Sequence, residues 1–398
     1  MDFMKKLFAV LLAAAMLLGL GNVALAEKTE VTMWYYWETV KHQETLNAML
    51  ETYNASQENV EVKAEYVPFA DFKKQVSIGA TADVLPDIVI IDNPDHANYS
   101  AMGIFADITD KIDVSAYYDG PVASCMLDGR LYGVPCGSNC LALYYNEDML
   151  KAAGCEVPTT WEELKTVAAA CTKDNVYGIA FCSLQNEEGT FNFMPWIWST
   201  GSTSFEIDNE NTIRAINMVK GLVDSGVMPK EAINWTQGDV MNQFISGNLA
   251  MMINGPWQVP TMREQAADLN WNVALIPMDT QYASALGGEN FAVIDNENVD
   301  ASVDFLTWMT APEQVATLNI GLGNIAPRSD VAETQFVGDA IMEKFVEQMQ
   351  YAQARGPHAR WPEISDAISL AFNQAIIGTE TPEAAAAAAQ ATIDSIIE

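Results

Sequence analysis

The first third of the chain alternates strand-like and helix-like segments, and this alternation limits its fold more than any other feature. Segments 30–37 and 60–67 are rich in β-forming residues, and 87–91 is apolar after its first residue. Between them, apolar residues recur at helical spacing around Leu46 and again over 69–80. Strands with continuous apolar runs are buried on both faces. The pattern therefore predicts an α/β protein with a mostly parallel sheet between helices.

The length and the order of segments predict two such units. A chain of 398 residues exceeds one ordinary hydrophobic core. Further strand and helix patterns continue to about residue 309, helices dominate after 336, and no long linker interrupts them. Two α/β lobes joined by short crossings are expected.

The N-terminus has the features of a secretory signal. Lys5 and Lys6 precede an apolar run over 7–20, and small residues lie at Ala24 and Ala26. This predicts a signal peptide over 1–26 and an exported protein, periplasmic or extracellular; an uncleaved anchor helix is the alternative. The first cysteine is Cys125, so no lipoprotein anchor is expected.

The formal net charge is −33, and removal of 1–26, which carries Asp2, Lys5 and Lys6, leaves −34. Such a field repels nucleic acid, anionic membranes and free anionic ligands. We therefore expect no nucleic-acid partner and a soluble, monomeric protein.

Six cysteines fall between 125 and 182, where buried free thiols and at least one disulfide are both open alternatives. Cys171 continues a helical apolar stripe, and Cys155 follows Gly154, a typical helix C-cap. The three histidines are dispersed, so neither a metal nor a cofactor is expected. Arg355 and Arg360 are expected to be solvated.

Aromatic residues gather where the predicted strands end. Trp37 ends the first strand and precedes Glu38, and Trp257 follows a Gly-Pro turn. Asp92 and Asn93 follow the third strand. Open α/β sheets bind ligands at the carboxyl ends of their strands, and flat aromatic faces suit sugar rings. The mixture predicts a site for a neutral polyol, although tryptophans also fill cores.

Several motifs resemble, in order, the extracellular solute-binding proteins of ABC transporters, the family that includes maltose-binding protein. They are LYGVP at 131–135, ALYYN at 142–146, PTTWEEL at 158–164 and FISGNLAMMINGPW at 244–257. The resemblance implies a two-lobed periplasmic-binding-protein fold with a ligand cleft at the hinge. It also implies delivery of the ligand to the permease subunits of an ABC importer.

The resemblance suggests lobe boundaries and ligand contacts. The expected N-terminal lobe is 27–138 plus 288–330, and the C-terminal lobe is 139–287 plus 331–398. Where maltose-binding protein has a late stacking tryptophan, this chain has Ser369 or a neighbour, so the resemblance extends to the family and not to maltose. The expected ligand-binding residues are Trp37, Glu38, Asp92, Asn93, Asn139, Asn192, Trp196, Trp257, Gly288, Glu289, Arg328 and Trp361.

The predicted function is capture of a sugar or oligosaccharide, with hinge closure around the ligand. One alternative keeps this fold and binds a polyamine, a peptide or another non-sugar solute. A second is a ferric-iron binder that uses Tyr144 and Tyr145. A third is a secreted carbohydrate-active enzyme, but the chain has no nucleophile elbow, zinc-protease motif or phosphate-binding glycine loop.

Overall fold

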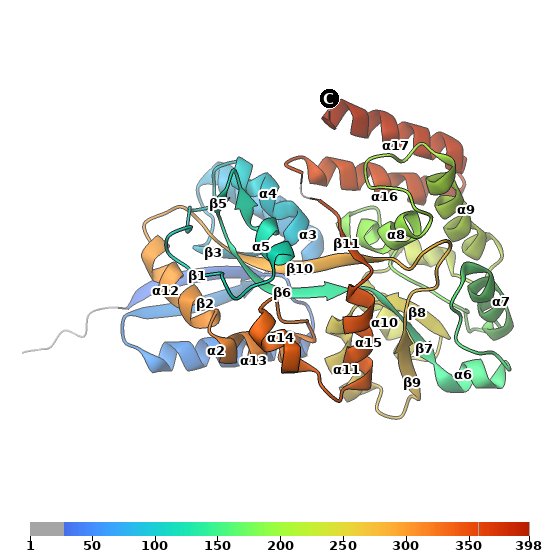
Figure 1. Cartoon of the computed structure of the whole chain (residues 1–398), viewed down its shortest axis with the longest axis horizontal. Coiled ribbons are helices and arrows are strands. Elements are labelled where there is room, and N and C mark those ends of the chain that lie inside the picture. The colour runs from blue at the N-terminus through green and yellow to red at the C-terminus, as the bar shows by residue number, and fades with distance from the viewer. Residues whose placement is uncertain (1–27, 357, 398) are drawn as a thin grey trace, which may run out of the picture.

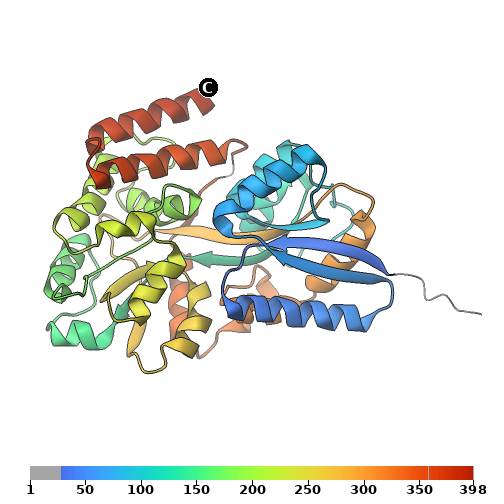
Figure 2. The ribbon, with the colours of Figure 1, turned by 180° about the vertical axis from the view of Figure 1, so that it is seen from behind.

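The computed structural model describes residues 28–356 and 358–397. Two lobes lie side by side, and β6 (Val134–Cys140) and β10 (Ser284–Val293) run between them (Figure 1). The view from behind shows helices on both faces of the first lobe's sheet (Figure 2). The predicted signal peptide lies outside the described residues. Within those residues, no helix is both long and apolar enough to cross a bilayer.

The first lobe contains the predicted βαβ pattern. Strands β1 (Thr29–Tyr35), β2 (Val60–Tyr66) and β3 (Ile88–Asp92) pair in parallel, and β10 adds antiparallel beside β3. Two further strands pair with β10: β6 is antiparallel to it and β11 (Ala352–Ala354) is parallel to it. The other elements of this lobe are α2 (Val40–Ser56), α3 (Phe69–Ala82), α4 (Asn93–Ala101), α5 (Asp119–Ser124), β4 (Met126–Leu127), β5 (Arg130–Leu131), α12 (Val299–Met309), α13 (Pro312–Leu322) and α14 (Ser329–Gln335).

The second lobe differs from the prediction of a mostly parallel sheet. Its central strand β7 (Ala142–Asn146) pairs antiparallel with both β8 (Met251–Asn254) and β9 (Trp271–Ala274). Residues 177–181 make only isolated parallel bridges to the β8 region. The prediction of a mostly parallel sheet is wrong for this lobe, because β7 follows directly from β6 and lies between two strands that run in the opposite direction.

Helices cover this second sheet and extend to the C-terminus. They are α6 (Glu147–Ala152), α7 (Trp161–Cys171), α8 (Glu187–Ser199), α9 (Glu210–Asp224), the 3₁₀ turns η1 (Lys230–Asn234) and η2 (Pro256–Gln258), α10 (Gln237–Ile245), α11 (Val259–Gln265), α15 (Ala340–Met349), α16 (Trp361–Ile377) and α17 (Pro382–Ile397). Thr160 and Glu163 form the capping box that starts α7.

Each lobe has its own hydrophobic core. One cluster combines β1–β3 with α12 and α13, and includes Val89 and Phe305. The second lobe's clusters combine β7–β9 with α6 to α11 and α15 to α17, and include Phe181 and Phe372. Separate cores allow the lobes to move as units about the strands that join them.

The joining strands meet in the region of the predicted boundaries. Ser138 pairs with Gly288, and Asn139 pairs with Gly287. The third predicted boundary, at 330/331, lies inside α14, which packs on α13 through Val331 and Val315. The lobe boundaries stay a prediction.

All six cysteines are unbonded, and only Cys155 is partly exposed. Cys171 lies in the second lobe's core, as its helical position predicts. Gly154 has a φ of 69°, and the amide of Cys155 donates to the carbonyl of Leu150. Of the two alternatives left open by the sequence, the structure has the free thiols.

Candidate functional site

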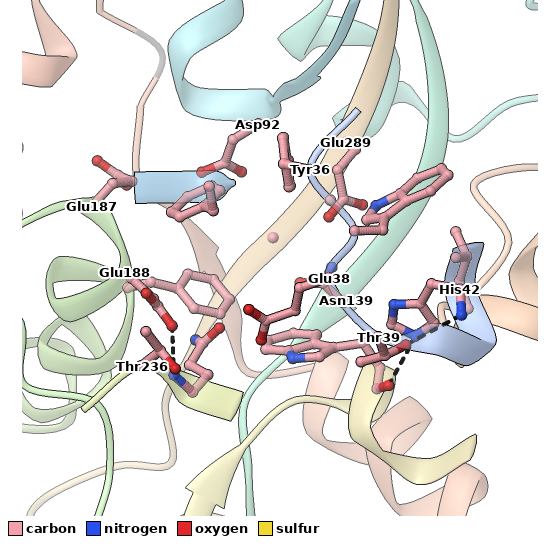
Figure 3. A pocket seen from close by; sticks show the side chains of 18 of the residues that line it. Tyr36, Glu38, Thr39, His42, Asp92, Asn139, Glu187, Glu188, Thr236 and Glu289 are labelled. Carbon is pink, nitrogen blue, oxygen red and sulfur yellow. Dashed lines mark hydrogen bonds between the residues drawn. The ribbon is translucent and has the colours of Figure 1, made fainter. Parts of the chain in front are cut away.

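A cavity of about 220 Å³ lies between the lobes, beside the paired strands β6 and β10 (Figure 3). Small-molecule sites usually measure roughly 300–1,000 Å³, so this volume suits a small ligand. Both lobes line it, with Tyr36, Trp37, Glu38, Thr39, His42, Tyr66, Pro68, Phe69, Ala70, Asp92, Asn139, Glu187, Glu188, Phe191, Thr236, Gln237, Trp257, Gly287, Gly288, Glu289, Leu322, Asn324 and Arg355.

Aromatic side chains from both lobes form much of the wall. Trp37 extends past the end of β1, and Trp257 lies on the turn after β8. Phe191 of α8 packs near Trp257, with 6.0 Å between the ring centroids. A Cβ at Gly255 would lie 1.8 Å from the Trp257 ring, so this glycine allows the indole to fold back over its own turn. The Gly-Pro-Trp sequence thus positions an aromatic face at the cavity.

A buried ion network lies at the hinge end of the cavity. The Arg355 guanidinium, 3% exposed, bonds both oxygens of Asp92 at 3.0 and 3.1 Å and Glu187 Oε1 at 2.5 Å. Lys73 of α3 pairs with Asp95 at 2.9 Å and with Glu187 at 3.7 Å. Asp92, Asp95 and Lys73 belong to the first lobe and Glu187 to the second, so the network joins the lobes directly.

These cations control the charge of the carboxyls that they contact. Burial disfavours the charged form of Glu187, but Lys73 and Arg355 outweigh burial and hold its pKa below the usual value. Burial, with Glu187 and Asp92 adding repulsion, raises the pKa of Asp95 to about 7 despite the nearby Lys73.

Three other cavity carboxyls form no ion pair in the described structure. Burial and the charge of Asp92 raise the pKa of Glu289 to about 8. Burial also raises the pKa of Glu188 to about 7, although its carboxylate accepts a 2.5 Å hydrogen bond from the Gln237 amide. Glu38 is an exposed residue, but partial desolvation of its carboxyl, followed by the charge of Asp239, raises its pKa.

Seven of the twelve predicted ligand-binding residues come together around this cavity. They come from β1, β3, β6, β8 and β10 or from the segments that directly follow these strands, as expected for a site at strand ends. They are Trp37, Glu38, Asp92, Asn139, Trp257, Gly288 and Glu289. Their contact with a ligand stays a prediction.

Two predicted tryptophans lie in the second lobe's core instead. Trp196 is 1% exposed and packs against Trp161 and Phe181, with ring centroids 5.6 and 5.2 Å away. Trp361 is fully buried, and its indole N–H donates to Glu187 Oε2 at 3.0 Å. Trp361 therefore orients a cavity carboxylate without lining the cavity.

The remaining three predicted residues also lie off the cavity wall. Asn192 is fully buried, and its amide nitrogen donates to the Glu188 carbonyl. Asn93 is the first residue of α4. The Arg328 guanidinium pairs with Asp330 and lies over the ring of Tyr117, a residue of the first lobe's core.

Sequence reasoning missed the acidic pair at the start of α8 and the arginine opposite it. Arg355 was expected to be solvated, and this prediction is wrong because Asp92 and Glu187 enclose its side chain. The adjacent acidic residues Glu187 and Glu188 resemble an ordinary helix first turn. No local pattern distinguishes them, since their partners are distant in sequence.

The paired tyrosines do not form an iron site. The Tyr144 hydroxyl donates to the Gly255 carbonyl at 2.7 Å and is fully buried. Tyr145, the next residue of β7, packs against a different core cluster. Because consecutive strand residues point to opposite faces, the two hydroxyls cannot bind one ion.

Comparisons with known proteins agree with this architecture. A family model described as "Bacterial extracellular solute-binding protein" matches residues 48–344, well over half of the chain. The lactose-binding protein of Rhizobium radiobacter is 25% identical over 421 residues, covering 95% of each chain.

Solved structures show the same two-lobed fold. The GacH receptor of Streptomyces glaucescens, determined unliganded and with acarbose, matches with a TM-score of 0.85 at 26% identity, over 93% of this chain and 98% of that one. An ABC transporter solute-binding protein from Thermotoga lettingae, bound with alpha-D-tagatose, matches with a TM-score of 0.88 at 22% identity, over 93% and 100%. These likenesses confirm the predicted fold class.

Proposed function

Because this chain belongs to the bacterial extracellular solute-binding protein family, we propose that it captures a sugar between its lobes and delivers it to an ABC importer. The observation that carries the proposal is that Trp37 from one lobe and Trp257 from the other line one cavity with carboxyl and amide groups. Aromatic faces can cover the apolar face of a sugar ring, and the polar groups can bond its hydroxyls.

The relatives support a sugar over a non-sugar solute. Relatives include a lactose-binding protein and a galactooligosaccharide-binding protein, and the two solved structures are bound to tagatose and acarbose. The sequence motifs and the family match indicate the same family of solute-binding proteins. Capture without turnover is part of the proposal, since these relatives are named as binding proteins.

Closure follows from the position of the cavity. A ligand that touches both walls gains its full set of contacts only when the lobes approach, so binding shifts the population toward the closed form. The pair Gly287 and Gly288 lies in β10 at the crossing, where rotation is concentrated. A permease that prefers the closed form then receives loaded protein.

The cellular setting is part of this proposal. We infer export through the segment 1–26 and action as a monomer. The ligand contacts proposed are the seven predicted residues around the cavity, together with Phe191 and Arg355.

A sugar panel tests the proposal. The purified protein is titrated calorimetrically and screened by thermal shift against mono- and disaccharides, with linear polyamines and short peptides as the non-sugar arm. A true ligand raises the melting temperature by mass action and leaves the sugar chemically unchanged. Binding confined to the non-sugar arm, or turnover of a bound sugar, would overturn it.

A further inference from the structure

Two carboxyls from opposite lobes lie near the start of α10. Glu38 follows β1 in the first lobe, and its Oε1 lies 2.5 Å from where a Cβ at Gly238 would be. Glu188 of α8 accepts the amide of the neighbouring Gln237 at 2.5 Å. Both side chains line the cavity, and they extend toward each other (Figure 3).

Asp239 adds a third negative charge behind this pair. Its carboxylate caps α10 by bonding Thr236, and it raises the pKa of both Glu38 and Glu188. The helix N-terminus offers only about half a positive charge. Approach of the lobes therefore brings like charges together, which opposes closure around an empty cavity.

Basic residues do not balance these charges in the described ranges. Arg355 and Lys73 are already paired with Asp92, Glu187 and Asp95. Lys41 lines a neighbouring groove together with Glu38, Glu44 and Asp239, but it makes no ion pair in the described residues. Burial lowers the pKa of His42 to about 4, so its imidazole is neutral near pH 7.

Resting on the proposed function, we propose that the captured sugar carries a protonated amino group, held between Glu38 and Glu188. An ammonium group has three donors and no acceptor, so it can bond both carboxylates at once. It would remove the repulsion between the lobes at the moment of closure. The faces of Trp37 and Trp257 also attract cations.

The site suits an ammonium group better than a metal ion. No cluster of three or more His, Cys, Asp or Glu groups able to hold a metal occurs in the part of the chain that the structure describes. The net charge of −33 also favours the approach of cationic over anionic solutes. A sugar amine combines the charge with hydroxyls for the remaining polar groups of the wall.

Matched sugars test the inference. Calorimetry at fixed salt compares glucosamine, galactosamine, mannosamine and the glucosamine β-1,4 dimer with the corresponding neutral and N-acetylated sugars. We expect the amine form of the true ligand to bind at least about tenfold tighter than its neutral counterpart, because charged hydrogen bonds replace neutral ones. Its affinity should also fall with added salt.

Charge-neutral variants locate the contact. Glu188→Gln keeps an oxygen for the Gln237 amide, and Glu38→Gln keeps the side-chain size. Each should weaken amine binding by about tenfold or more and erase the preference over the neutral sugar. Glu44 is an exposed residue of the groove that Lys41 lines, so Glu44→Gln should change neither the amine affinity nor the preference for the amine. Melting temperatures of the unliganded variants show that they fold.

The outcomes separate this inference from the proposed function. The inference fails if neutral or N-acetylated sugars bind as well as the amines, or if no amino sugar binds. Binding of a neutral sugar would still support the proposed function of sugar capture. If only linear polyamines bind, both fail. If the preference for the amine remains in both the Glu38→Gln and the Glu188→Gln proteins, the amino group is not bound between these two carboxyls.

Discussion

Arg355 and Asp92 form a two-point ion pair of 3.0 and 3.1 Å, although 263 residues separate them in the chain. The same guanidinium bonds Glu187, so one side chain after β11 connects the end of β3 with the start of α8. It also lies over the Phe191 ring, 4.4 Å from the centroid. The cavity's hinge end therefore depends on this residue.

Replacing Arg355 with methionine should destabilise the protein strongly. The substitution leaves Asp92 and Glu187 buried with less compensation, and removing one partner of a buried ion pair typically costs about 3–5 kcal/mol. Urea unfolding followed by fluorescence measures the change. Arg360→Met is the control, because its pair with Glu363 is exposed at the start of α16, and it should cost under about 1 kcal/mol. Equal effects of the two substitutions would contradict the proposed role.

Replacing Trp257 with alanine should weaken sugar binding by about 2 kcal/mol, roughly 30-fold, as loss of an aromatic anchor does. Calorimetry with the sugar identified by the panel measures it. Trp271→Ala is the matched control, since Trp271 lies in the same lobe, stacks on Tyr144 at 5.7 Å and lies off the cavity wall. Unchanged affinity in a folded Trp257→Ala protein would remove this residue from the site.

The stability of the unliganded protein should depend on the protonation of Glu289. Its pKa is raised from 4.5 to about 8, chiefly by burial. Between these values the folded protein keeps a proton that the unfolded chain releases. This contribution is fully present below pH 4.5 and is lost as the pH rises through 8. Asp92 and Arg355 face the same group, and Asn324 bonds it.

Glu289→Gln tests this dependence, because an amide imitates the protonated carboxyl at every pH. Melting temperatures from pH 5 to 8 should fall less steeply in the variant than in the original protein. Glu44→Gln, outside the cavity, should leave the profile unchanged. A parallel profile for Glu289→Gln would show that this carboxyl is ionised throughout.

Gly288→Ala should destabilise the crossing between the lobes. Gly288 has a φ of 144°, and an added Cβ would lie 2.2 Å from the Gly137 carbonyl oxygen. Backbone strain of this kind costs about 1–3 kcal/mol before the steric clash is added. Gly103→Ala measures the backbone strain without a steric clash, because Gly103 has a φ of 73° with open space around it. Unfolding experiments should show a larger loss for Gly288→Ala; equal losses would exclude the clash.

Local signals in the sequence predicted local structure well. The apolar stripe around Leu46 forms α2, and Gly154 ends α6 in the left-handed conformation. Each depends on residues within a few positions of one another, so the chain alone contains the whole interaction. The order of family motifs extended this to the two-lobed fold.

Tryptophans show where such reasoning stops. Trp37 and Trp257 line the cavity, whereas Trp196 and Trp361 fill the second lobe's core, although all four had similar aromatic or proline-flanked surroundings in the sequence. Whether a large side chain faces solvent or a core depends on the segments packed over it. Those segments come from distant parts of the chain, so the sequence pattern could not separate the two pairs.

The sequence by itself determined the secondary structure of the first lobe, the membership of a two-lobed family and most of the residues at the strand ends. Only the tertiary structure decided the antiparallel pairing of β7 and the burial of Arg355 between Asp92 and Glu187. The physical reason is range: propensities and caps act over one or two turns, while strand direction and charge pairing depend on which distant segments meet.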